Sequence, residues 1–172
     1  MKINFYVAVV VMFVLMVIVP PIILFGFKKK PKVIKIFTIV LSAIYFVLLI
    51  IGTTAKVYLS GTDVVISYPN SAEWFSMRFA VLNGGKVNIL INLALLFPLG
   101  FIVYVFSDKN NFLKTIILAF LVSFIIELYQ FVLPINRSTE LADLLFNTIS
   151  GLISATYCQI LSKFGAFGFK NK

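Results

Sequence analysis

Residues 87–106 read VNILINLALLFPLGFIVYVF, an uncharged and mostly apolar run of twenty residues. A helix needs about 20 mostly apolar residues to cross the hydrocarbon core of a bilayer. Four other runs of similar length and composition lie on either side of this one. The five predicted helices cover residues 3–27, 36–55, 87–106, 115–133 and 141–161. The sequence therefore predicts an all-α integral membrane protein, in which residues 1–172 form one membrane domain with five transmembrane helices.

The composition of the chain supports this prediction. Of its 172 residues, 61% are hydrophobic and 12% are charged, and the mean hydropathy is +1.07. A soluble domain has about 45–50% apolar and about 25% charged residues, so a soluble globular domain is excluded. We expect the first apolar run to be retained, because it is too long for a signal peptide and no small-x-small cleavage site ends it. Pro20 and Pro21 are expected to kink the end of this helix or stop it early.

The charge balance is strongly positive, with 15 Lys and Arg against 6 Asp and Glu. The basic residues are scattered between apolar runs, so anionic lipid headgroups explain them better than nucleic acid does. Ten of them lie on one side of the predicted helices: Lys28, Lys29, Lys30, Lys32, Lys35, Lys109, Lys114, Lys163, Lys170 and Lys172. Five lie on the other side: Lys2, Lys56, Arg78, Lys86 and Arg137. The positive-inside rule therefore places the N-terminus outside and the C-terminus in the cytoplasm.

The longer of the two outer loops, residues 56–86, is too long to be a mere connection and is predicted to hold structure of its own. Residues 63–68 indicate an extended segment. Asn70 offers a helix N-cap and Glu73 follows three residues later. A short helix that carries Trp74 is therefore predicted to lie at the membrane interface in this first outer loop.

Polar side chains in and between the predicted helices are the candidates for a ligand-binding site, because such groups are costly in a bilayer and need partners. They are Asn88, Asn92, Glu127, Gln130, Arg137, Glu140, Asp143 and Asn147. With the predicted orientation, all eight lie in the outer half of the membrane or in the outer loop. We interpret them as one polar cluster that opens outward. The same residues could instead form an internal network that locks the outer hairpin.

Arg137 is the natural counter-ion of this cluster, because its five donors can bridge two carboxylates. The sequence leaves open whether it meets Glu127 or Asp143. No metal and no cofactor are expected, since the chain has one cysteine, Cys158, and no histidine. Cys158 is expected to be a small apolar packing residue.

Two further features concern helix shape and packing. Pro98, followed by Gly100, is expected to kink the helix over residues 87–106. Small residues in the last predicted helix favour close helix packing. These are Ser150, Gly151 and Ser154.

The second half of the chain resembles the VanZ-like family of small membrane proteins. The matching pieces are NLALLFPLG at 92–100, ELYQ at 127–130, Arg137, DLLFNT at 143–148 and Gly151. The resemblance covers residues 88–156, which we take as the VanZ-like core. Two positions depart from the family pattern. Glu140 stands in for part of an acidic pair expected around Asp143, and Ser150 stands where the family has glycine.

The resemblance implies an accessory protein of glycopeptide resistance in the plasma membrane of a Gram-positive bacterium. Such proteins give low-level protection against teicoplanin without remodelling the peptidoglycan precursor. Our first hypothesis is therefore an outward-facing pocket that binds or blocks a lipoglycopeptide antibiotic at the cell surface, with membrane lipids as its other partners.

Two other functions remain in competition with this one. The chain could be a membrane-embedded enzyme that acts on a lipid-linked cell-envelope precursor, with Glu127 and Asp143 as candidate catalytic residues. Against an enzyme, the sequence offers no obvious nucleophile and no metal ligands. A transporter is the third class. The sequence shows no inverted repeat, and the polar cluster stops near the middle of the membrane, so a path through a single chain is disfavoured.

Overall fold

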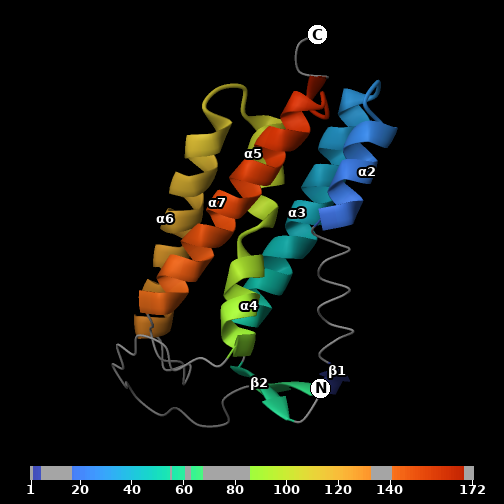
Figure 1. Cartoon of the computed structure of the whole chain (residues 1–172). Helices are drawn as coiled ribbons and strands as arrows, with labels where there is room; N and C mark the ends of the chain where they lie inside the picture. The colour runs from blue at the N-terminus through green and yellow to red at the C-terminus, as the bar shows by residue number, and fades with distance from the viewer. Residues whose placement is uncertain are drawn as a thin grey trace.

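The computed structural model describes residues 2–4, 17–54, 56–60, 63–67, 86–132 and 141–168. These residues form a helical bundle with a small sheet at one end (Figure 1). The helices are α2 (Val19–Gly26), α3 (Pro31–Thr54), α4 (Lys86–Leu95), α5 (Pro98–Phe106), α6 (Asn111–Val132) and α7 (Leu141–Lys163). The strands are β1 (Lys2–Asn4), β2 (Lys56–Ser60) and β3 (Asp63–Ser67), paired antiparallel in the order β1-β3-β2.

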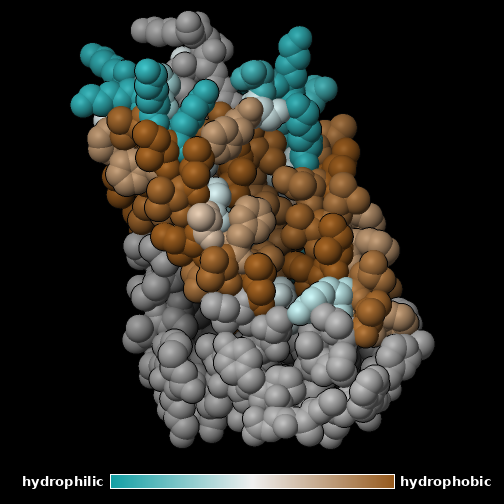
Figure 2. All heavy atoms as spheres, turned by 180° about the vertical axis from the view of Figure 1, so that it is seen from behind, coloured by the Kyte–Doolittle hydropathy of each residue, from teal (hydrophilic) through white to brown (hydrophobic). Residues whose placement is uncertain are grey.

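Four helical segments of the described chain are long and apolar enough to cross a membrane. They cover Pro31–Ile50, Ile89–Phe106, Asn111–Val132 and Leu141–Lys163. These segments correspond to the last four predicted helices, and Figure 2 shows apolar side chains, in brown, over the face of the bundle that it draws. The predicted helices are therefore confirmed for these four segments, which have the length and composition of membrane-spanning helices. Residues 5–16 of the first predicted helix lie outside the described residues.

The start of the first predicted helix is wrong. Residue 3 was expected to be helical, but Ile3 lies in β1, opposite Val64 of β3. An edge strand carries unpaired backbone groups, and pairing with β1 satisfies those of β3. Pro20 and Pro21 lie in the first turn of α2, at its N-terminal end, and not at the C-terminal end of a helix. Proline is tolerated there, because the first N–H groups of a helix have no acceptor within it.

The predicted kink in the third membrane segment is confirmed. The α-helical hydrogen bonding is interrupted at Leu96 and Phe97, immediately before Pro98, and this separates α4 from α5. Phe97 N–H donates to the carbonyl of Ala94, three residues back, at 3.2 Å. Proline has no N–H and its ring clashes with the preceding helical turn. The carbonyl oxygens around the break find other donors, as a membrane interior requires. Tyr45 Oη donates to the carbonyl of Leu95 at 3.0 Å, and Ser154 Oγ donates to the carbonyl of Phe97.

Small residues allow α7 to pack closely on α5 and α6. A Cβ added to Gly100 would lie 2.1 Å from Ser154 Oγ. A Cβ added to Gly151 would lie 2.2 Å from the Cβ of Ala119. Both distances are far shorter than van der Waals contact, so neither position has room for a side chain. The expectation that Gly151 serves close helix packing is therefore confirmed.

The connecting segments gather at two ends of the bundle. The α2–α3 turn, the α5–α6 turn and the C-terminal end of α7 lie together at the upper end in Figure 1, and the sheet lies at the opposite end. The predicted extended segment is confirmed as β3, whereas the interfacial helix expected after Asn70 lies outside the described residues. The orientation of the bundle in the membrane stays a prediction. We call the sheet end the outer end, as the positive-inside rule predicts.

Candidate functional site

A hydrogen bond between α4 and α7 joins two of the predicted site residues. Asn92 Nδ2 donates to Asp143 Oδ1. Asn92 is buried and Asp143 is half-buried. Asp143 lies in the first turn of α7, where the helix dipole and the unpaired N–H groups favour a negative charge. The bond therefore links the outer part of α4 to the beginning of α7 through an ionisable side chain.

Two further site residues lie in the last turns of α6. Glu127 is 5% exposed and Gln130 is 4% exposed. Gln130 Nε2 donates to the backbone carbonyl of Thr53 at 3.1 Å, which ties α6 to the end of α3. Thr53 itself is buried. Polar hydrogen bonds thus join the outer ends of α4 and α7 and, separately, those of α3 and α6.

The packing of α6 against α7 places the two carboxyl side chains at one level of the bundle. Gly151 faces Ala119, and the two helices run in opposite directions side by side (Figure 1). Four residues farther toward the outer end, Ser123 comes level with Asn147. Another turn farther, Glu127 comes level with Asp143. Two acidic residues therefore share one layer near the outer end.

Several buried oxygens of this region have no hydrogen-bond partner among the described residues. They are Ser123 Oγ, Gln130 Oε1, Asn147 Oδ1 and Ser150 Oγ. Ser123, Asn147 and Ser150 are at most 1% exposed. Burying an unpaired polar atom costs about 1–3 kcal/mol, so native proteins keep few of them. Four such atoms, on the outer half of α6 and the first half of α7, form a seam of unpaired acceptors.

Three residues of the predicted cluster have side chains outside the described part of the structure. Asn88 lies in α4, one helical turn before Asn92, and its side chain is outside the described part of the structure. Arg137 and Glu140 lie outside the described residues. The pairing of Arg137 with a carboxylate, left open by the sequence, therefore stays a prediction.

The comparison with known proteins agrees with the motifs that lie in this region. The family model described as VanZ/LLP1 matches residues 4–162, nearly the whole chain. The chain belongs to the VanZ/LLP1 family. No curated protein and no solved structure matches it.

The VanZ/LLP1 match extends beyond the core of residues 88–156 on both sides, so α2, α3, β2 and β3 belong to the family region as well. The family motifs have distinct places in the fold. NLALLFPLG at 92–100 covers the end of α4, the break and the start of α5. ELYQ at 127–130 lies in the outer turns of α6, and DLLFNT at 143–148 lies in the first turns of α7. The Asn92–Asp143 bond thus connects the first and the last of these motifs.

Two contributors to this region of the VanZ/LLP1 fold were missed by sequence reasoning. Thr53 accepts a hydrogen bond through its backbone carbonyl, so its side chain gave no signal of the contact. Only its predicted position near the outer end of its helix, like that of Gln130, could have indicated it. Tyr45 lies in a long apolar run, and its hydroxyl group meets a carbonyl freed by the break before Pro98. A hydroxyl group within an apolar membrane segment indicates a hydrogen bond to a neighbouring helix.

Proposed function

We propose that this protein protects the bacterial cell envelope against lipoglycopeptide antibiotics of the teicoplanin type. In this proposal, the polar cluster opens to the outer surface of the plasma membrane and binds the antibiotic, or blocks it, before it reaches its target. Membership of the VanZ/LLP1 family supports a role of this kind. The cluster supplies groups that could bind a polar peptide and sugars next to an apolar membrane surface.

The observation that carries the proposal is the seam of unpaired acceptors beside the Asn92–Asp143 bond. A peptide core presents N–H donors, and sugars present hydroxyl donors. A donor that reaches Asn147 Oδ1 or Ser150 Oγ satisfies an atom that is otherwise buried without a partner. An acyl chain on the same ligand would stay in the surrounding lipid. A lipoglycopeptide, which has a polar core and an apolar tail, fits both the acceptors and the surrounding lipid.

The test measures antibiotic binding and protection together on Asn147→Leu. Leucine has a similar volume and removes the unpaired oxygen, so the melting temperature of the purified protein should stay constant or rise. Binding of fluorescently labelled teicoplanin to the protein in nanodiscs should weaken by about tenfold, the value of one hydrogen bond. The inhibitory concentration of teicoplanin for cells that express the variant should fall accordingly.

Ser154→Ala is the matched control, because Ser154 is as deeply buried on the same helix but its hydroxyl group donates to the carbonyl of Phe97. This variant should lose about 0.6 kcal/mol of stability, and at most about 1.7 kcal/mol, while it binds teicoplanin normally. The binding proposal is wrong if the wild type gives protection without binding the drug, or if Asn147→Leu binds and protects as the wild type does.

A membrane-embedded enzyme is the second candidate, and the burial of Glu127 favours it. A carboxyl group that is 5% exposed and level with a second acidic residue is suited to accept or donate a proton in a reaction. Its substrate would be a lipid-linked sugar or phosphate ester of the cell envelope.

Glu127→Gln is expected to separate this candidate from the binding function. Glutamine keeps the shape and the hydrogen-bonding oxygen but cannot transfer a proton, so an enzyme should lose about 10²–10⁴-fold in rate. The measurement is the profile of lipid-linked precursors, by mass spectrometry, in cells that carry the wild type, the variant or a deletion. An enzyme requires that deletion changes the profile and that only the wild type restores it. An identical profile in all three strains excludes the enzyme.

A further inference from the structure

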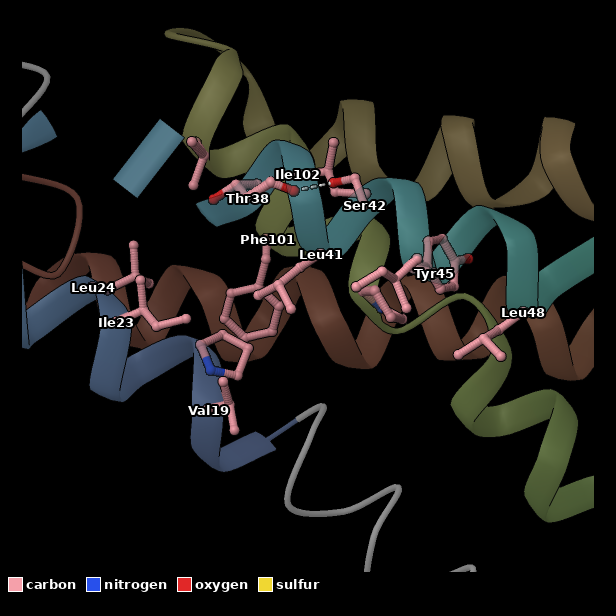
Figure 3. A pocket seen from close by; sticks show the side chains of 14 residues that line it. Val19, Ile23, Leu24, Thr38, Leu41, Ser42, Tyr45, Leu48, Phe101 and Ile102 are labelled. Atoms are coloured by element: carbon pink, nitrogen blue, oxygen red, sulfur yellow. Dashed lines mark hydrogen bonds between the residues drawn. The ribbon is translucent and has the colours of Figure 1, made fainter. Parts of the chain in front are cut away.

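A groove of about 280 Å³ lies between α2, α3 and α5, away from the polar cluster. Figure 3 shows its walls: Val19, Ile23 and Leu24 come from α2, Leu41, Tyr45 and Leu48 from α3, and Phe101 and Ile102 from α5. The three hydroxyl groups on its wall from α3 all donate hydrogen bonds already. Tyr45 Oη donates to the carbonyl of Leu95, and the other two donate within α3. Thr38 Oγ1 donates to the carbonyl of Ile34 at 2.9 Å, and Ser42 Oγ donates to the carbonyl of Thr38 at 2.6 Å. The groove therefore offers an apolar surface to its occupant.

The groove is open toward the surrounding membrane rather than sealed. Two of its lining residues, Ile44 and Leu48, are 52% and 58% exposed. In a bilayer such a surface is in contact with hydrocarbon chains. Along α3 the lining runs from Thr38 to Leu48, which is about 15 Å at 1.5 Å per residue. This length is half of the hydrocarbon thickness of about 30 Å, and so matches the chain of one lipid in one leaflet.

A cluster of lysines lies at one end of the groove. The turn from α2 to α3 and the first turns of α3 carry exposed lysines: Lys28, Lys29, Lys30, Lys32 and Lys35. Lys35 comes three residues before the groove residue Thr38, and Lys28 comes four residues after Leu24. Figure 2 shows hydrophilic side chains, in teal, gathered at this end of the apolar surface. An apolar groove one leaflet deep with cations at its end is complementary to an amphiphile with a negative headgroup.

We propose that this groove is a binding site for one anionic phospholipid, with an acyl chain between α2, α3 and α5 and its phosphate at the lysines of residues 28–35. Four to eight basic residues beside a transmembrane helix are typical of anionic-lipid binding. The acyl chain in the groove would hold the lipid at one position, which the lysines alone would not do. The predicted orientation puts the site in the cytoplasmic leaflet. The site is distinct from the outer polar cluster and does not depend on the function proposed for it.

The test compares lipids retained by the full chain in native mass spectrometry. The protein is purified from nanodiscs of equal parts dioleoyl-phosphatidylglycerol and dioleoyl-phosphatidylcholine, two lipids with the same chains and different headgroup charge. The wild type should retain one phosphatidylglycerol per chain, with a preference of about tenfold or more over phosphatidylcholine. Equal retention of the two lipids, or retention of neither, overturns the proposal.

Matched variants test the contribution of the groove to lipid retention separately from that of the lysines. Leu41→Trp fills the groove and should abolish retention, whereas Ile39→Trp places the same ring on an exposed position of α3 outside the lining and should leave it unchanged. Ser42→Leu is a smaller groove-filling change that should weaken retention if the tryptophan variant does not fold. Retention that persists in the groove-filling variants overturns the proposal. So does a dimer of the wild type that dissociates in Leu41→Trp, because a second copy would then cover the groove.

The headgroup contribution has its own matched pair. The triple variant Lys30→Gln, Lys32→Gln and Lys35→Gln should reduce the preference for phosphatidylglycerol by about tenfold or more. The triple variant Lys109→Gln, Lys114→Gln and Lys163→Gln removes the same charge from exposed lysines at the same end of the bundle. It should keep the preference. If both triple variants lose it equally, the lysines act only through overall charge and the proposed headgroup position is wrong.

Discussion

Replacing Gly151 with alanine is expected to destabilise the protein by about 1–3 kcal/mol, and replacing it with leucine is expected to leave little folded protein. The reason is steric. A Cβ at Gly151 would lie 2.2 Å from the Cβ of Ala119, and the backbone carbonyl of Thr115 lies 3.6 Å away. The obstructing atom is attached directly to the α6 backbone, so no side-chain rotation relieves the overlap. The two helices would have to move apart along the surface that holds them together.

The measurement is thermal unfolding of the purified protein in one detergent, with gel filtration to follow the folded fraction. Gly26→Ala is the control, because a Cβ at Gly26 meets no atom within 4 Å. Its melting temperature should stay constant or rise slightly, since alanine favours a helix more than glycine does. If Gly151→Ala is as stable as the wild type, α6 and α7 do not pack at this point. The inference that Glu127 and Asp143 lie at the same level of the bundle would then have no basis.

Much of the membrane fold was predictable from the sequence because the bilayer imposes a length and a composition on every spanning helix. The last four apolar runs became the four long apolar segments of the bundle. The ends of these helices were less predictable. α3 begins at Pro31, five residues before the predicted start at residue 36, and takes in Lys32 and Lys35. Hydropathy marks the hydrocarbon core, whereas a helix continues into the headgroup region.

The strand at the N-terminus could not be predicted from local sequence. Ile3 begins an apolar run that is long enough for a helix, and nothing in the residues around it signals a strand. Its structure depends on β3, about sixty residues later in the chain, which offers Val64 as its partner. Pairing across such a separation is a tertiary effect that overrides local pattern.

The candidate site was predictable in its location and only partly in its contacts. Helical spacing placed Asn92 and the residues of α6 and α7 near one end, and Asn92, Glu127, Gln130 and Asp143 are polar groups of that end. The sequence suggested Arg137 as the partner of a carboxylate, which stays a prediction because Arg137 lies outside the described residues. It did not indicate that the amide of Asn92 would donate a hydrogen bond to Asp143. Pairing among polar residues depends on helix rotation and on sub-ångström distances, which residue spacing does not determine.

Asp143→Asn is expected to abolish protection against teicoplanin while it leaves the protein almost as stable as the wild type. An asparagine side chain keeps an oxygen that can accept the hydrogen bond from Asn92 Nδ2, so the link between α4 and α7 persists. The negative charge at the start of α7 is lost. If that charge binds the ligand or orients its partner, the inhibitory concentration of teicoplanin should fall to that of cells without the gene.

Asp143→Leu supplies the comparison that separates charge from structure. Leucine removes both the charge and the acceptor, which leaves the buried amide of Asn92 without this partner at a cost of about 1–3 kcal/mol. This variant should lose stability as well as protection. Asp108→Asn is the control for charge alone, because Asp108 is an exposed acid at the opposite end of the bundle. It should keep both properties of the wild type.

These three variants decide between the two roles that the sequence left open for the polar cluster. A cluster that only locks the outer hairpin requires the hydrogen bond and tolerates the neutral side chain, so Asp143→Asn would protect normally and only Asp143→Leu would fail. A ligand-binding cluster requires the charge, so Asp143→Asn would fail at normal stability. Melting temperature and inhibitory concentration must be measured on the same variants, because a loss of protection at wild-type stability cannot come from a weakened tether.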